Sequence, residues 1–145
     1  TGDSFGLAYP ALRRNGLFIF PSTSPTEFDP EAAIETVDRI VTSGVKRVFL
    51  THFGELGDLQ SARLQLDEHL RFAGKLYGEA IAGDEEFETL RIRFEAELKE
   101  KFALMAANGG LVLTPDDWRM LETDLRLNAD GIAYAGIRAR TERKG

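Results

Sequence analysis

The sequence contains no cysteine, which excludes disulfides, thiolate nucleophiles and zinc sites built on cysteine. Histidine is scarce as well, so His52 and His69 are the only imidazole side chains available as ligands or bases. Long hydrophobic runs are also missing, because the most apolar short stretch, residues 16–21, is far too short to span a bilayer. We therefore expect a cytoplasmic protein without a membrane partner.

Positive charge is in deficit, with 18 Lys and Arg against 24 Asp and Glu and a formal net charge of −6. A nucleic-acid surface needs a basic stripe to neutralise phosphates, so this balance argues against nucleic acid as a partner. Hydrophobic residues make up 43% of the chain, which is enough to bury a core and argues against disorder. The first residue, Thr1, is not Met and begins no charged and apolar leader, so we expect that the chain was cut, processed or truncated from something longer.

The chain divides into residues 1–54 and 55–145 by residue type and by charge, with net charges of −1 and −5. The first part is typical of mixed α/β structure. Asn15-Gly16 predicts a tight turn, and the apolar residues 17–20 predict a strand buried on both faces. Residues 45–50 are rich in β-branched and aromatic side chains and predict a second strand.

A helix is expected between these two strands. Asp29 can cap its free N–H groups, Pro30 suits the first helical position, and Gly44 can end it in a left-handed conformation. Strand, helix and strand would form a β-α-β unit, which places functional groups at the carboxyl ends of its strands. His52 would lie at such an end.

The second part is typical of an all-helical structure, because apolar residues recur at helical spacing. Gly83 separates a first long helix from a second one, which Asp84 can cap and Asn108-Gly109-Gly110 can end. Thr114-Pro115-Asp116-Asp117 predicts the start of a third helix, and we expect a separate final helix around Gly136. The apolar faces comprise Leu59, Ala62, Leu66, Leu70, Ala73, Tyr77 and Ala80, then Phe87, Leu90, Phe94, Leu98, Phe102 and Met105, then Trp118, Leu121 and Leu125.

Asp3 and His52 are the candidate metal ligands. Asp3 follows a glycine, and its carboxylate is a hard ligand that can bridge two cations. His52 follows an apolar strand, and a neutral imidazole is a common ligand of zinc or iron. Each residue alone also fits a structural role, Asp3 as a cap of the following segment and His52 as a partner of the backbone at a strand end.

Other polar and aromatic residues fit structural roles better than chemical ones. His69 has no metal-ligating partner three or four residues away, so we expect a surface histidine. Arg13 and Arg14 are expected at a solvated turn, and Trp118 is expected to anchor one helix on another. The aromatic residues near the candidate ligands fit a core better than the mouth of a pocket: Phe5, Tyr9 and Phe53.

Three stretches resemble the C-terminal half of a metallo-β-lactamase-fold hydrolase: residues 1–7, which begin Thr1-Gly2-Asp3, residues 20–30, and Leu50-Thr51-His52-Phe53-Gly54. The resemblance implies that residues 1–54 belong to an αββα sandwich and that residues 55–145 form a helical C-terminal extension. It also implies that Asp3 bridges two divalent metal ions and that His52 binds the second. Zinc is the first choice, with iron or manganese as alternatives.

The family's H-x-H-x-D-H motif and a further histidine lie upstream of Thr-Gly-Asp, and two histidines cannot supply those ligands. We therefore expect weak or no metal binding and little activity from this chain alone. The intact protein would use metal-activated water on a small-molecule ester, thioester, lactone or lactam. We expect the missing N-terminal segment, or a second copy paired by strand exchange, as partner. The alternative is a non-catalytic helical interaction or dimerisation module built on a remnant of the fold.

Overall fold

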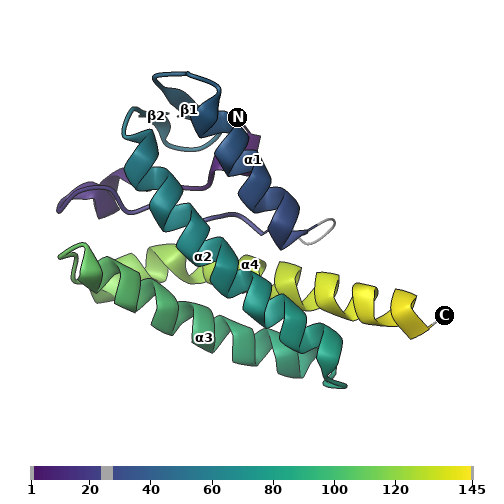
Figure 1. Cartoon of the computed structure of the whole chain (residues 1–145). Coiled ribbons are helices and arrows are strands. Elements are labelled where there is room, and N and C mark those ends of the chain that lie inside the picture. The colour runs from purple at the N-terminus through teal and green to yellow at the C-terminus, as the bar shows by residue number, and fades with distance from the viewer. Residues whose placement is uncertain (1, 24–27, 145) are drawn as a thin grey trace.

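A computed structural model describes residues 2–23 and 28–144 of the chain, which form a mostly helical structure with one small β-hairpin. Helices α2, α3 and α4 lie together as a bundle, while α1 packs against α2 and the hairpin lies near the start of α2 (Figure 1). The elements in chain order are the 3-10 helices η1 (Gly2–Phe5) and η2 (Pro10–Arg13), then α1 (Pro30–Thr42), β1 (Val48–Leu50), β2 (Gly54–Leu56), α2 (Leu59–Ala82), α3 (Phe87–Asn108) and α4 (Pro115–Lys144).

The α/β expectation for residues 1–54 is not met by the described part of the chain. Its sheet has two strands, β1 and β2, which pair antiparallel with Phe49 opposite Glu55. The predicted β-α-β unit is wrong, because β1 pairs with the strand that follows it instead of with residues 17–20. Within the described residues we therefore see no αββα sandwich.

Residues 18–20 are buried as expected and Leu17 is partly buried, but residues 17–20 do not form a strand and their backbone groups find other partners. Phe20 forms a single antiparallel bridge with Leu7, with N–H to O distances of 3.1 and 2.8 Å. The Gln65 side chain of α2 accepts a hydrogen bond from Ile19 N at 3.1 Å and donates one to Leu17 O at 2.9 Å. Buried backbone N–H and C=O groups must be hydrogen-bonded, and here the Gln65 side chain is the partner of two of them.

Helix α1 begins as its sequence predicts. Asp29 Oδ1 accepts hydrogen bonds from the backbone N–H groups of Glu31 and Ala32, at 2.9 and 3.0 Å. Beyond its end, Gly44 has a φ of +82°, the left-handed conformation that glycine adopts without strain. The strand expected at residues 45–50 is shorter, since β1 covers only Val48–Leu50.

The three long helices follow the predicted apolar faces except at Phe87, which is 37% exposed, and two helix boundaries need correction. Asp84 is not the cap of α3, which begins at Phe87 after the N-cap residue Glu86. The separate final helix is also wrong, because α4 continues unbroken to Lys144. At its start, Thr114 N donates to Asp117 Oδ2 at 2.8 Å and Asp117 N donates to Thr114 Oγ1 at 3.3 Å, a reciprocal capping box.

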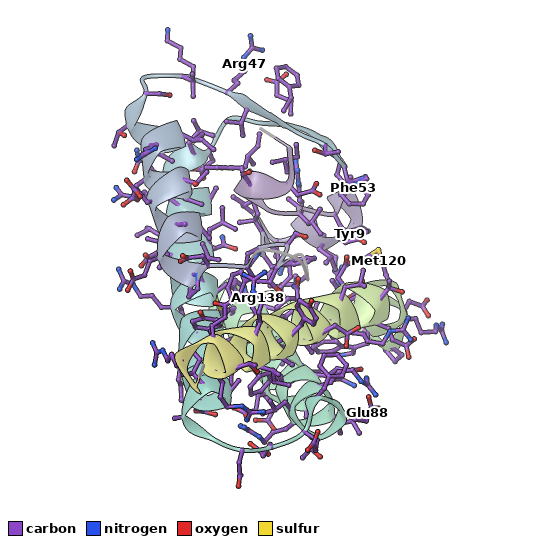
Figure 2. All side chains as sticks on the ribbon, turned by 90° about the vertical axis from the view of Figure 1, so that its right-hand side faces the viewer. Tyr9, Arg47, Phe53, Glu88, Met120 and Arg138 are labelled. Carbon is purple, nitrogen blue, oxygen red and sulfur yellow. The ribbon has the colours of Figure 1, made fainter. Side chains whose placement is uncertain are left out.

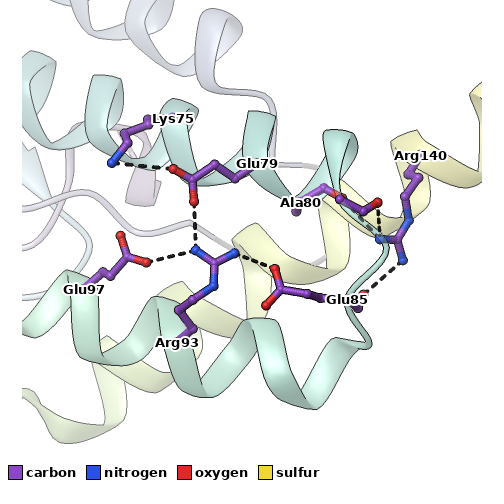
Figure 3. Close-up of polar contacts among 8 residues, drawn as sticks. Lys75, Glu79, Ala80, Glu85, Arg93, Glu97 and Arg140 are labelled. Atoms are coloured by element: carbon purple, nitrogen blue, oxygen red, sulfur yellow. Dashed lines mark hydrogen bonds and ion pairs between the residues drawn. The ribbon is translucent and has the colours of Figure 1, made fainter.

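Helices α2 and α4 cross at very close range. A Cβ atom added to Gly136 would lie 2.4 Å from Ala80 Cβ, so only glycine permits this approach. Nearby, Arg140 donates hydrogen bonds to Gly83 O at 2.9 Å and to Glu85 O at 3.2 Å, which ties α4 to the connection between α2 and α3 (Figure 3). These contacts hold the C-terminal part of α4 on the bundle.

Arg93 of α3 lies at the centre of an ion-pair group at the same end of the bundle (Figure 3). Its guanidinium contacts Glu79, Glu85 and Glu97 at 2.8, 2.8 and 3.0 Å. The pair with Glu79 links α3 to α2, and the pair with Glu85 links α3 to the connection between the two helices. All four side chains are about one-third exposed, so solvent screens the attraction.

Buried side chains from both parts of the sequence belong to one continuous core, which extends from Phe5 to Ala135. Phe20 of the first part and Phe102 of α3 meet in it, with ring centres 4.9 Å apart. The division after residue 54 remains a prediction about domain organisation. No helix in the described part of the chain has the length and apolarity needed to cross a bilayer.

Candidate functional site

Asp3 and His52 both lie at the surface, on neighbouring elements. Asp3 is an exposed residue of η1, and His52 is an exposed residue of the turn between β1 and β2. Because η1 contacts β1, the two residues come from segments that pack together. Within the described part of the chain, no hydrogen bond or ion pair engages the Asp3 carboxylate or joins it to His52.

The turn that carries His52 rests on an aromatic pair. Phe53 has a φ of +80°, an unusual conformation for a residue with a bulky side chain. Its ring centre lies 4.2 Å from that of Tyr9 and 6.1 Å from that of His52. Tyr9 in turn donates a hydrogen bond from its hydroxyl to Asp124 Oδ2 of α4 at 2.7 Å. Figure 2 shows Tyr9 and Phe53 at the same edge of the molecule, above α4.

Burial shapes the electrostatics of this contact. It raises the pKa of Asp124, while the Tyr9 hydrogen bond and the nearby His52 oppose the rise. Burial also raises the pKa of Tyr9 to about 12, helped by the hydrogen bond to Asp124 and by its negative charge. Tyr9 is therefore a protonated donor at neutral pH, and Asp124 is its acceptor.

The donor chemistry of Asp3 and His52 suits a divalent metal, but their number does not complete a site. Zinc sites need three or four protein ligands, of which carboxylate oxygen and imidazole nitrogen are two usual types. In residues 2–23 and 28–144, no three His, Asp or Glu side chains are grouped so that they could hold a metal ion. The described residues therefore form no complete metal centre, and the assignment of Asp3 and His52 as ligands stays a prediction.

A cavity of about 570 Å³ lies next to Asp3, between η1, α1 and α2. Its lining includes Asp3 and Ser4 from η1, Asp29 at the start of α1, and Leu66 and Leu70 from α2. His52 is not among its described lining residues. The cavity therefore connects one of the two candidate ligands, Asp3, with a concave surface.

His69 is buried, so the expectation of a surface histidine is wrong. Only 2% of it is exposed, and its Nε2 atom has no hydrogen-bond partner in the described structure. The imidazole packs edge-on against Phe102 and Phe18, with ring centres 5.0 and 6.4 Å away. Burial, and secondarily the charge of Lys101, lowers its pKa to about 3. Its three-residue spacing from Leu66 on the apolar face was the signal that could have revealed its burial.

The arginines and aromatic residues near the first turn also differ from expectation. Arg14 does not lie free at a solvated turn, since it donates to Val112 O at 2.9 Å and to Asp117 Oδ1 at 3.2 Å. Its guanidinium thus helps to fix the turn to the start of α4. Phe5 is buried in the core as expected, whereas Phe53 is 38% exposed.

Trp118 meets the expectation of an interhelical anchor. It is partly buried on α4 against the hydrophobic core, and Lys99 of α3 places its ammonium 5.2 Å from the centre of the indole ring. Arg13 donates to Ala8 O at 3.1 Å, so it too contacts the protein instead of extending into solvent.

Comparisons with protein-family models, with curated proteins and with solved structures find no match for this chain.

Proposed function

We propose that this chain contributes Asp3 and His52 to the binuclear metal centre of a metallo-β-lactamase-type hydrolase, and that the remaining ligands come from outside these residues. The proposal rests on the Thr1-Gly2-Asp3 and Thr51-His52-Phe53-Gly54 motifs. The observation that supports it best is that both side chains are exposed, Asp3 on η1 and His52 in the turn that follows β1, the strand that η1 contacts. An unpaired carboxylate at the surface is available to a ligand in a way that a buried or ion-paired one is not.

The two residues have separate roles in this proposal. Asp3 would hold the metal ions through its carboxylate oxygens, and His52 would contribute one imidazole nitrogen. The chemistry that such a centre supplies when loaded is a metal-activated water nucleophile and polarisation of the substrate carbonyl. Tyr9 and Phe53 hold the turn that presents His52, and Asp124 fixes Tyr9. Small-molecule esters, thioesters, lactones and lactams are the substrate class.

Metal analysis of the intact natural protein tests the proposal. We expect about two equivalents of zinc, iron or manganese per chain, because a bridging carboxylate implies a binuclear centre. Asp3→Asn and His52→Gln should each lower the bound metal and the hydrolysis of a model ester or lactone. An intact protein that is purified without metal, and stays without it after metal is added, would overturn the proposal.

Asp84→Asn is a matched control for Asp3→Asn. Asp84 is an exposed acidic residue in the connection between α2 and α3, remote in sequence from both candidate ligands. Its substitution removes the same charge from the protein surface and should leave the bound metal unchanged. Equal metal loss in the two variants would point to nonspecific binding by surface carboxylates.

The second candidate function, a helical interaction module, is favoured by an exposed stripe on α4. Leu127 and Tyr134 are 47% and 48% exposed and lie seven residues apart, hence on one face of the helix. If this stripe pairs with another copy, Leu127→Glu should convert a dimer to a monomer in sedimentation velocity. A wild-type chain that sediments as a monomer at all concentrations would exclude self-association.

A further inference from the structure

The cavity next to Asp3 has the size and the interior of a small-molecule site. Its volume of about 570 Å³ lies within the range of roughly 300–1,000 Å³ that such sites occupy. Its floor is apolar, since the buried side chains of Val37, Leu66 and Leu70 line it. The body of a ligand would therefore be apolar.

The charged groups around this floor are all acidic among the lining residues that the structure describes. Two carboxylates, Asp3 and Asp29, line the cavity together with hydroxyl groups from Ser4, Ser22 and Thr36. None of the lining residues that the structure describes is a lysine, arginine or histidine. The described lining therefore offers negative charge and hydroxyl groups to a ligand, and it provides no cationic side chain to pair with an anionic one.

One carboxylate oxygen of Asp29 accepts hydrogen bonds from the backbone, and the other accepts none within the described part of the chain. Its Oδ1 atom accepts the hydrogen bonds from Glu31 N and Ala32 N that cap α1, which holds the carboxylate in a fixed position. Its Oδ2 atom makes no hydrogen bond within the described part of the chain. A carboxylate that is already oriented by its own helix loses little freedom when it binds a cation.

We propose that this cavity binds a small amphiphilic cation, with an ammonium group on Asp29 and an apolar body against Leu66 and Leu70. The proposal deepens the proposed function: if Asp3 is a metal ligand, Asp29 is the carboxylate left for the substrate. The substrate is then an ester, thioester or lactone that carries a positive charge. Phosphodiesters and lactams with a carboxylate are disfavoured, because their charge would face Asp29 unpaired.

Ligand titrations followed by NMR on the full chain without metal test the charge preference. The probes are 3-phenylpropylamine, 3-phenylpropanol and 3-phenylpropanoate, which share one apolar body and differ in charge. We expect the amine to bind most tightly, with a Kd about tenfold below that of the carboxylate. The shifted amide signals should come from residues 32–37 and 66–70. Equal binding of amine and carboxylate, or no shifts there at millimolar probe, would overturn the proposal.

Asp29→Asn removes the charge and keeps the fold, because asparagine caps a helix as well as aspartate does. It should weaken amine binding about threefold to tenfold and leave alcohol binding unchanged. Asp58→Asn is the matched control: Asp58 caps α2 by accepting from Ser61 N at 3.1 Å and does not line the cavity. Equal losses of amine binding in both variants would contradict a role for Asp29.

Ala33→Trp gives a second check, since Ala33 lines the cavity and an indole there would fill it. It should abolish binding of all three probes, and unchanged binding would show that the probes bind elsewhere. The two proposals fail separately. If the probes bind with the expected charge preference but the intact protein holds no metal, the cation site stands and the hydrolase proposal fails. If the intact protein holds metal but the probes show no charge preference, the hydrolase proposal stands and the cation site fails.

Discussion

Tyr9 donates its hydroxyl hydrogen to Asp124 Oδ2 at 2.7 Å, a bond between residues 115 positions apart in the chain. It joins the segment after η1 to the middle of α4, and the Tyr9 ring also supports Phe53 in the hairpin turn. One side chain thus connects three segments that the sequence keeps far apart. The candidate ligand His52 adjoins this contact, so its position depends on the C-terminal helix.

Tyr9→Phe should destabilise the protein by about 1–2 kcal/mol, because it leaves the half-buried Asp124 without its donor. The aromatic ring stays, so the contact with Phe53 is retained and the loss reports the hydroxyl alone. Urea unfolding measures the change. Tyr134→Phe removes the same hydroxyl from an exposed tyrosine of α4 and should change stability by less than about 0.5 kcal/mol. Equal effects of the two substitutions would contradict the role of the Tyr9–Asp124 bond.

Gly136→Ala should destabilise the protein by about 1–3 kcal/mol, because the added methyl group would lie 2.4 Å from Ala80 Cβ and force α2 and α4 apart. Gly78→Ala is the matched control, since a Cβ at Gly78 of α2 meets no atom within 4 Å. That variant should gain up to about 1 kcal/mol from helix propensity. Thermal unfolding compares the two, and a stabilised Gly136→Ala protein would show that the helices separate easily.

Buried His69 should make the protein sensitive to mild acid. Its pKa falls from 6.5 to about 3 on folding, so the unfolded chain binds a proton that the folded chain refuses. Above pH 6.5, His69 is neutral in both the folded and the unfolded chain, and its contribution to the free energy of unfolding is complete. As the pH falls from 6.5 towards 3, this contribution is lost by up to about 1.4 kcal/mol per pH unit. Urea unfolding at a series of pH values measures the slope.

His69→Leu separates this titration from that of the carboxylates. The variant has no imidazole to protonate and no unpartnered Nε2 atom, so it should be about 1–3 kcal/mol more stable at pH 7. Between pH 7 and 5 its stability should fall less than that of the wild type. If the two proteins lose stability in parallel over this range, protonation of His69 is not the cause.

Asn128→Leu should cost about 2–4 kcal/mol, because it removes a buried amide that serves two backbone groups. Asn128 Oδ1 accepts from Thr23 N at 2.8 Å, and its Nδ2 donates to Pro21 O at 3.0 Å. Hydrogen exchange at Thr23 should accelerate in parallel with the loss measured in urea. Arg126→Leu, at an exposed position of the same helix, is the control and should leave both measurements nearly unchanged.

The helices were predictable because their signals are local. Asp29 and Thr114 mark helix starts through bonds within three residues, and Leu66, Leu70 and Ala73 repeat at the helical period. The hydrogen-bond partners of residues 17–20 were not predictable, because an apolar run does not reveal which groups will pair with its backbone N–H and C=O groups. Here the partner is Gln65, 46 and 48 residues away, and nothing in the local pattern identifies it.

The candidate site was predictable only as two separate residues. Sequence patterns indicated Asp3 and His52, and both lie at the surface. What lies beside each residue depends on how the whole chain folds. The cavity at Asp3 and the Tyr9–Asp124 bond arise from segments distant in sequence, so spacing could not predict them. The prediction of a surface His69 was wrong because it rested on the absence of metal-ligating neighbours, whereas the place of His69 on the apolar face of α2 decides its burial.

Gln65 gives α2 a fixed position along its own axis. Its amide bonds both Ile19 N and Leu17 O, so a slide of α2 by one residue, about 1.5 Å, would strain or break both bonds. Apolar contacts alone tolerate such slippage, whereas a two-point amide contact does not. Gln65 therefore fixes the register of α2 against residues 17–19, and a shift of the helix past this segment would cost both hydrogen bonds.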